Sequence, residues 1–190
     1  MVAYAVCADP LSGLVRIDST NESNSADSMG VSAFCPAGKV LTGTGYELNG
    51  AQGEVIVDDL RPNGISLDGP TAVDVGAFEA DPPFAANWSV TAYAICADRL
   101  PLHRLVASHD TSPSTSDDAR VAQPRCPIGG FVTGAGFELN GASGEVVPTA
   151  LAPNGSPSGP GHLVDVNAFK EDPFAGTWSL RGDAICTIPR

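Results

Sequence analysis

Positive charge is scarce in this chain. Its 190 residues include only 10 lysines and arginines against 22 aspartates and glutamates, giving a formal net charge of −12. The basic residues nowhere cluster into a stripe, so the chain lacks the electrostatic footprint that binding to a phosphate backbone requires. Nucleic acids and anionic membranes are therefore not expected as partners.

Long apolar runs and long helical patterns are missing as well. No stretch approaches the roughly 18 consecutive apolar residues of a membrane helix, so membrane insertion is not expected. Short β-branched runs alternate instead with clusters of Gly, Asn, Asp and Pro, a pattern typical of strands joined by turns. The fold class is predicted to be all-β.

Signatures of metal sites and of nucleophilic catalysis are also lacking. There is no Cys-x-x-Cys, no histidine beside a cysteine and no Gly-x-Ser-x-Gly elbow, which argues against zinc and against a hydrolase of that type. The histidines His103, His109 and His162 fall in the second half only and are interpreted as surface residues. No cofactor or metal is expected. Ca²⁺ is the one ion that the excess of acid would allow, although no complete calcium loop occurs.

What the chain does contain is a repeat. Residues 47–55 return as residues 138–146 with one change in nine, and the strand pattern around Cys96 is related to those around Cys7 and Cys186. The spacing of about 90 residues is too long for a solenoid and indicates a duplication. We predict two similar units, residues 1–97 and 98–190, of about six strands each. They would form a β-sandwich or β-prism-like fold and could pack as one fused globule.

The start of the chain is expected to be the first strand. Residues 1–7 are apolar and β-branched, without the basic n-region or the cleavage site of a signal peptide. Further along, a Gly-x-Gly pattern places Gly43 and Gly45 on one face of a strand, and Gly134 and Gly136 repeat it. Bare backbone of this kind lets a ring or another sheet approach closely. Packing by the unit's own tryptophan is the favoured interpretation.

Five cysteines, all on expected strands, admit two pairings that respect the repeat. Cys35–Cys96 with Cys126–Cys186 closes each unit on itself and leaves Cys7 over. Cys7–Cys35 with Cys96–Cys126 joins neighbouring strands and leaves Cys186 over. The first is favoured because it explains Cys7 as the end of an upstream unit. Either pairing implies an oxidising location, extracellular or on a particle surface.

The opening Cys35-Pro36-Ala37-Gly38, the Gly-x-Gly strand and the closing run from Trp88 to Ala97 together resemble secreted repeat proteins of actinobacteria and their phages. The resemblance covers nearly the whole chain. It implies secretion and carries no catalytic residues. A much weaker similarity is to the β-prisms of vitelline-membrane outer-layer proteins.

The repeated hairpin supplies the candidate binding residues. Its tips carry asparagine and acids beside an aromatic ring, a combination that suits glycans. The full set is Tyr46, Glu47, Asn49, Glu54, Phe137, Glu138, Asn140 and Glu145. The polar loops Asp18–Ser28 and Asp110–Asp118, which differ between the units, are nearly equal candidates. Turn formation alone would also account for the glycines and asparagines of the tips.

These observations favour a non-enzymatic, surface-exposed module that binds a glycan or cell surface through its repeated loops. Two copies would gain avidity on a polyvalent target. The alternative is a structural subunit, such as a coat, fibre or phage decoration protein, that contacts copies of itself or a particle. A hydrolase that uses the repeated carboxylates is a lesser alternative, because Glu47 and Glu54 flank one hairpin tip and could face each other.

Overall fold

The computed structural model describes residues 3, 5–7, 9–64, 66–80, 84–100, 103–142, 144–154, 162–171 and 175–189, except for the side chains of residues 103, 104 and 189. Within these ranges the chain forms twelve strands and no helix, so the all-β prediction is confirmed. No helix there is long and apolar enough to cross a membrane. The strands are β1 (Val15–Thr20), β2 (Ser28–Phe34), β3 (Lys39–Asn49), β4 (Val55–Asn63), β5 (Ala72–Glu79), β6 (Ser89–Asp98), β7 (His103–Thr111), β8 (Ala119–Ala122), β9 (Phe131–Asn140), β10 (Val146–Asn154), β11 (Leu163–Lys170) and β12 (Ser179–Pro189).

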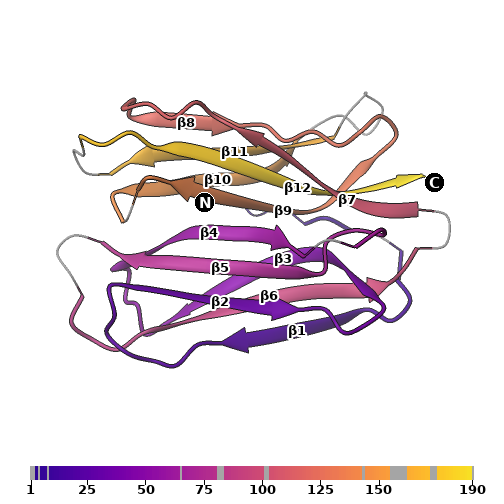
Figure 1. Cartoon of the computed structure of the whole chain (residues 1–190), viewed down its shortest axis with the longest axis horizontal. Helices are drawn as coiled ribbons and strands as arrows, with labels where there is room; N and C mark the ends of the chain where they lie inside the picture. The colour runs from indigo at the N-terminus through magenta and orange to yellow at the C-terminus, as the bar shows by residue number, and fades with distance from the viewer. Residues whose placement is uncertain are drawn as a thin grey trace.

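The strands form three antiparallel sheets (Figure 1). One has the order β1-β6-β3, a second β10-β11-β8, and the third β2-β5-β4-β9-β12-β7. The third sheet runs across both units, because β4 pairs with β9 through Asp59↔Glu138 and Leu60↔Phe137. The first unit supplies β1 to β6 and the second supplies β7 to β12. The orders β1-β6-β3 and β2-β5-β4 in the first unit correspond to β7-β12-β9 and β8-β11-β10 in the second. The arrangement agrees with the predicted sandwich-like fold.

The two units share one hydrophobic core. Trp88 and Trp178 are fully buried in it and lie among small residues of β6 and β12. The Trp88 indole donates a hydrogen bond of 2.9 Å to the Glu79 carboxylate, whereas Trp178 donates to the backbone oxygen of Asp117, also at 2.9 Å. Each buried indole N–H is therefore satisfied, as buried polar groups require.

The hairpin between β3 and β4 has the predicted turn chemistry. Gly50 and Gly53 have φ angles of 76° and 93°, in the left-handed region that glycine enters without strain. Between them, Gln52 also has a positive φ, 50°. The repeated tip sequence is thus accounted for by folding, as the sequence alone allowed.

Disulfides Cys35–Cys96 and Cys126–Cys186 are formed, which is the favoured pairing. Each joins one three-stranded sheet to the six-stranded sheet. The prediction that every cysteine lies on a strand is wrong for Cys7, Cys35 and Cys126. Cys35 lies in the connection between β2 and β3, and Cys126 in the connection between β8 and β9. In both places the chain passes from one sheet to another.

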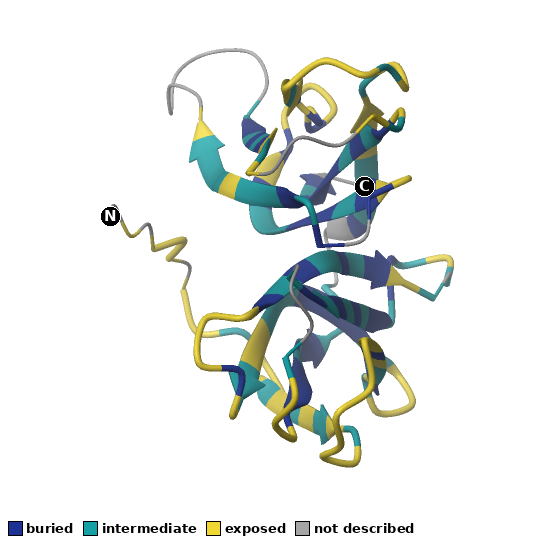
Figure 2. Cartoon of the chain, turned by 90° about the vertical axis from the view of Figure 1, so that its left-hand side faces the viewer, coloured by how far each residue is buried: buried dark blue, intermediate teal, exposed yellow. Residues whose placement is uncertain are grey.

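The residues that the structure describes before Val15 do not form the expected N-terminal strand. They belong to no strand and are mostly exposed, and Figure 2 shows them as a coil beside the sheets. Cys7 is a free, exposed cysteine. The apolar pattern of this segment matches β6, whose place in the sheet is between β1 and β3. Because β6 itself fills that place, the segment cannot occupy it.

The prediction that each unit's own tryptophan covers the glycine face is wrong: Gly43 and Gly45 have Ile95 and Tyr93 of their own unit as nearest neighbours, whereas Gly134 and Gly136 approach the other unit. A Cβ atom on Gly134 would lie 2.8 Å from the Cα of Gly43 and 2.9 Å from the oxygen of Thr42. A Cβ atom on Gly136 would lie 2.7 Å from Pro62 and closer still to the backbone of Leu60. The bare backbone thus lets strands of the two units approach each other.

Candidate functional site

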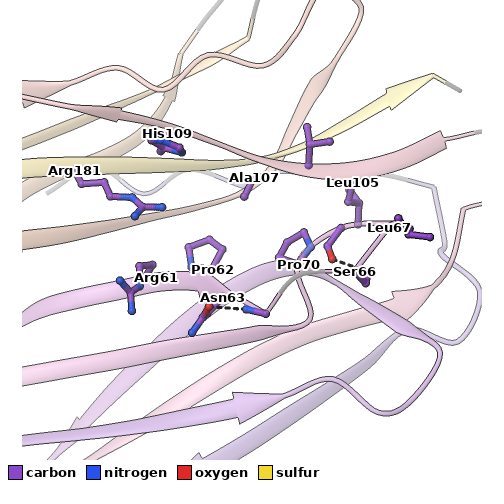
Figure 3. A pocket seen from close by; sticks show the side chains of 13 residues that line it. Arg61, Pro62, Asn63, Ser66, Leu67, Pro70, Leu105, Ala107, His109 and Arg181 are labelled. Atoms are coloured by element: carbon purple, nitrogen blue, oxygen red, sulfur yellow. Dashed lines mark hydrogen bonds between the residues drawn. The ribbon is translucent and has the colours of Figure 1, made fainter.

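A groove of about 510 Å³ lies between the two units. One wall comes from β7 and β12, and the other from the end of β4 and the following turn (Figure 3). Its volume is within the roughly 300–1,000 Å³ of ligand pockets. The described residues that line it are Arg61, Pro62, Asn63, Gly64, Ser66, Leu67, Gly69, Pro70, Leu105, Val106, Ala107, His109 and Arg181.

One end of the groove is closed by the turn at residues 66–70. The Ser66 hydroxyl donates to the backbone oxygen of Gly69 at 2.8 Å and so holds the turn tight. The Leu105 amide donates to the backbone oxygen of Asp68 at 2.9 Å, which fixes the turn against β7. Gly69 has no room for a side chain there, because a Cβ atom would lie 2.7 Å from the Cβ of Leu105. With Pro70 and the exposed Leu67, this end is mainly apolar.

The other end holds two arginines that are paired with carboxylates. Arg61 approaches Glu138 at 3.3 Å and Asp74 at 3.5 Å. Arg181 approaches Asp183 at 2.9 Å and Glu138 at 3.7 Å. Glu138 on β9 thus lies between an arginine of each unit. These carboxylates hold the two guanidinium groups in place, and Figure 3 shows both arginines at the same end of the groove as His109.

Acids beside these arginines are unusually buried. Asp183 is fully buried; its Oδ1 accepts from Arg181, and its Oδ2 has no hydrogen-bond partner. Burial raises the pKa of Asp183, and the charges of Arg181 and His109 oppose that rise. Burial also raises the pKa of Asp58 to about 6 and that of Asp59 to about 7, with Glu138 adding to both shifts. Part of the local negative charge is therefore neutralised near neutral pH.

Asp59 is expected to make the protein less stable as the pH rises. Its pKa is about 7 in the folded state, against an ordinary value of 3.8 for an aspartate, so the folded state holds this proton longer than the unfolded state does. Stability should fall from about pH 4 to about pH 7 and then level off. After allowance for partial solvent exposure, Asp59→Asn should remove about 1–2 kcal/mol of this loss. Urea unfolding across that pH range measures it.

Asp117→Asn is a control, because the stability that Asp117 contributes depends on pH in the opposite direction. Hydrogen bonds from Arg120 and Thr115 lower the pKa of the exposed Asp117. Its contribution is therefore present above the unfolded pKa and is lost as the pH falls through the lowered folded value. A stability profile of Asp59→Asn that is parallel to the wild type from pH 4 to pH 8 would contradict the assignment of the proton to Asp59.

The residues predicted from the sequence do not form one site. Tyr46 and Phe137 line a separate hollow of about 200 Å³ with residues 148–151 of β10, although Phe137 is buried. Glu47 accepts a hydrogen bond of 2.5 Å from the Tyr93 hydroxyl, and Asn49 donates to the Thr91 hydroxyl at 3.1 Å.

The remaining predicted residues are scattered. Glu138 alone belongs to the charge cluster beside the groove. Glu54 and Asn140 are exposed at the ends of their hairpins, and Glu145 is half-buried. Among the described residues, no group of three or more His, Cys, Asp or Glu side chains is arranged to hold a metal ion.

The histidines differ from one another. His109 lines the groove, as a residue exposed to solvent. His162 is half-buried and packs edge-on against Phe131, with ring centroids 4.8 Å apart, so the surface interpretation is wrong for it. The side chain of His103 lies outside the described residues.

The groove residues Arg61, Arg181 and His109 are not predicted by the repeat, because they differ between the two units. Arg61 corresponds to Ala152, Arg181 to Thr91 and His109 to Asp18. At the positions of Arg61 and Arg181 only the residue in the groove is positively charged, and at the position of His109 the counterpart is an acid. Comparing the charges at matched positions would have pointed to all three.

Comparison with protein-family models, with curated proteins and with solved structures finds no match to this chain. The geometry of the groove therefore carries the functional argument.

Proposed function

We propose that this chain is a non-enzymatic, extracellular binding module that holds a carboxylate-bearing ligand in the groove between its units. The observation that carries the proposal is the convergence of Arg61, Arg181 and His109 on one end of that groove. In a chain with a net charge of −12, these groups come from strands of both units. A planar guanidinium matches a carboxylate through two parallel hydrogen bonds.

The acids around the arginines support this role. Glu138, Asp74 and Asp183 hold the guanidinium groups, so little side-chain freedom is lost when a ligand binds. Arg61 and Arg181 still keep 31% and 27% of their side-chain surface exposed. They can therefore donate to a ligand as well as to their own carboxylates.

Binding is favoured over hydrolysis by the composition of the walls. Asp58 and Asp59 have the raised pKa values that suit acid catalysis, but they are not among the described residues that line the groove. The disulfides agree with an oxidising, extracellular setting. Glycan binding at the hairpin tips and assembly into a coat or fibre stay predictions.

Titration calorimetry with acidic and neutral ligand pairs tests the proposal. The pairs are oligogalacturonate with its methyl ester, and capped glutamate peptides with their glutamine counterparts. We expect an acidic member to bind and its neutral counterpart to fail. Arg61→Gln should weaken binding about 10- to 100-fold, the effect of losing a charged hydrogen-bond donor.

Arg181→Gln is the second test variant, and its thermal unfolding must be measured as well, because it removes the partner of the buried Asp183. Arg16→Gln is the control, since Arg16 stacks on Tyr93 away from the groove. The proposal is wrong if no acidic ligand binds, or if Arg16→Gln weakens binding as much as Arg61→Gln does.

A further inference from the structure

β7 forms one wall of the groove and is also the last strand of the six-stranded sheet. Within the part of the chain that the structure describes, its only strand partner is β12, on one side, with Ala107 opposite Ile185 and His109 opposite Asp183. An edge strand of this kind presents unpaired backbone groups that another extended segment can use. The open edge of β7 is therefore available for backbone pairing in the groove.

The hydrogen bonds around β7 show which amides face this open edge. The Ser112 amide donates to the Leu180 oxygen of β12 at 2.8 Å, whereas the Leu105 amide donates to Asp68, away from β12, at 2.9 Å. Successive residues of an antiparallel strand alternate in direction. The amides of Ala107 and His109 therefore face the same way as that of Leu105, away from β12 and toward the side on which the turn at residues 66–70 lies.

The protein already uses the first position of this edge for its own chain. Asp68 and Gly69 lie against Leu105 as a short segment of backbone would lie in a sheet. Beyond them the groove continues along Ala107 to His109. A bound peptide strand would pair with β7 beyond Leu105, at Ala107 and His109.

Resting on the proposed function, we infer that the carboxylate-bearing ligand is an extended acidic peptide that adds a strand to the free edge of β7. Its acidic side chain meets Arg61 and Arg181, and its backbone pairs with Ala107 and His109. Such strand addition takes affinity from main-chain hydrogen bonds and specificity from alternate side chains.

The two ends of the groove define the sequence of the peptide. His109 and Leu105 are four residues apart on β7, which is about 13 Å in a strand. The charged end lies near His109, and Leu67, Pro70 and Leu105 make the other end apolar. Side chains on one face of a strand recur every second residue. The peptide therefore carries an apolar residue two or four positions from its acidic residue.

Calorimetry on the whole protein with three capped peptides tests the inference. The parent peptide has glutamate at one end, leucine four positions away, and threonine and valine between them. A second peptide has glutamine in place of glutamate, and the third is made in two versions, N-methylated at alternate amides in one register or in the other. We expect glutamine, and the N-methyl register that blocks the amides facing β7, to weaken binding at least about tenfold, since each removes hydrogen bonds to the protein.

A protein variant provides the matching evidence. Ala107→Pro removes one amide from the free edge, a position where an edge strand tolerates proline, and should weaken the parent peptide at least about tenfold. Arg16→Pro is its counterpart on β1, the edge strand of the sheet β1-β6-β3, and should leave binding unchanged.

The outcomes separate this inference from the proposal beneath it. If the N-methylated peptides bind as well as the parent, or if oligogalacturonate binds and no peptide does, strand addition is wrong and carboxylate binding stands. If no carboxylate ligand binds, both are wrong.

Discussion

Replacing Gly136 by alanine is expected to destabilise the protein by about 3 kcal/mol or more, at the upper end of what overpacking costs. Gly136 lies on β9 where β4 of the other unit crosses closely. An added methyl group would be 2.7 Å from the Pro62 ring and would overlap the backbone oxygen of Leu60. Backbone cannot rotate out of the way, so β4 and β9 must move apart. Thermal and urea unfolding measure the loss.

The repeat supplies a matched control in Gly45. It occupies the corresponding position of β3, but a methyl group there would lie 3.6 Å from the Tyr93 Cβ, an ordinary contact. Gly45→Ala should be neutral or stabilising by up to about 1 kcal/mol, because alanine loses less backbone entropy than glycine on folding. Equal losses in the two variants would show that the contact between the units does not set the cost.

Gly136→Ala also bears on the groove. Moving β4 away from β9 would separate Arg61 from Arg181, which come from different units and share Glu138. Ligand binding by Gly136→Ala should decrease at least as much as the fraction of folded protein decreases. Gly45→Ala should keep full binding, since β3 contributes no described residue to the groove.

The sequence was a good guide to local structure. Alternation of apolar residues located the strands that close each unit, and the asparagines and glycines of the hairpin tip predicted its turn. The pairing favoured from the sequence, Cys35–Cys96 with Cys126–Cys186, closes each unit on itself, and the structure forms both bridges. These features depend on residues within one unit, where spacing along the chain limits what can meet.

The contacts between the units could not be predicted from patterns within one unit. The Gly134–Gly43 approach and the pairing of β4 with β9 depend on how two folded units meet, and no periodicity encodes this. The N-terminal segment shows the reverse problem. It has the pattern of β6, but the place that this pattern fits, between β1 and β3, is already filled by β6 itself.

The groove combines both difficulties. Arg61 and Arg181 are far apart in the chain and differ from their counterparts in the repeat, so neither spacing nor similarity brings them together. Asp183 is an acid in a strand of the core, where an apolar residue is the usual choice. Its position beside Arg181 explains how it is accommodated there.

Removing either disulfide is expected to cost up to about 4 kcal/mol, the value that the chain-entropy model gives for loops of this length. Cys35 and Cys96 are separated by 61 residues and Cys126 and Cys186 by 60, so Cys35→Ala/Cys96→Ala and Cys126→Ala/Cys186→Ala should lose similar amounts. Each bridge ties a different three-stranded sheet to the six-stranded sheet. Urea unfolding of the two double variants measures both losses.

Reducing both bridges together should have a larger effect than either pair of substitutions. Two losses of about 4 kcal/mol approach the roughly 5–15 kcal/mol by which folded domains are stable, so the reduced protein should unfold at far lower temperature. The free Cys7 is exposed and outside every strand, and Cys7→Ala is the control that should change nothing. A reduced protein as stable as the oxidised one would contradict this account and weaken the argument for an oxidising location.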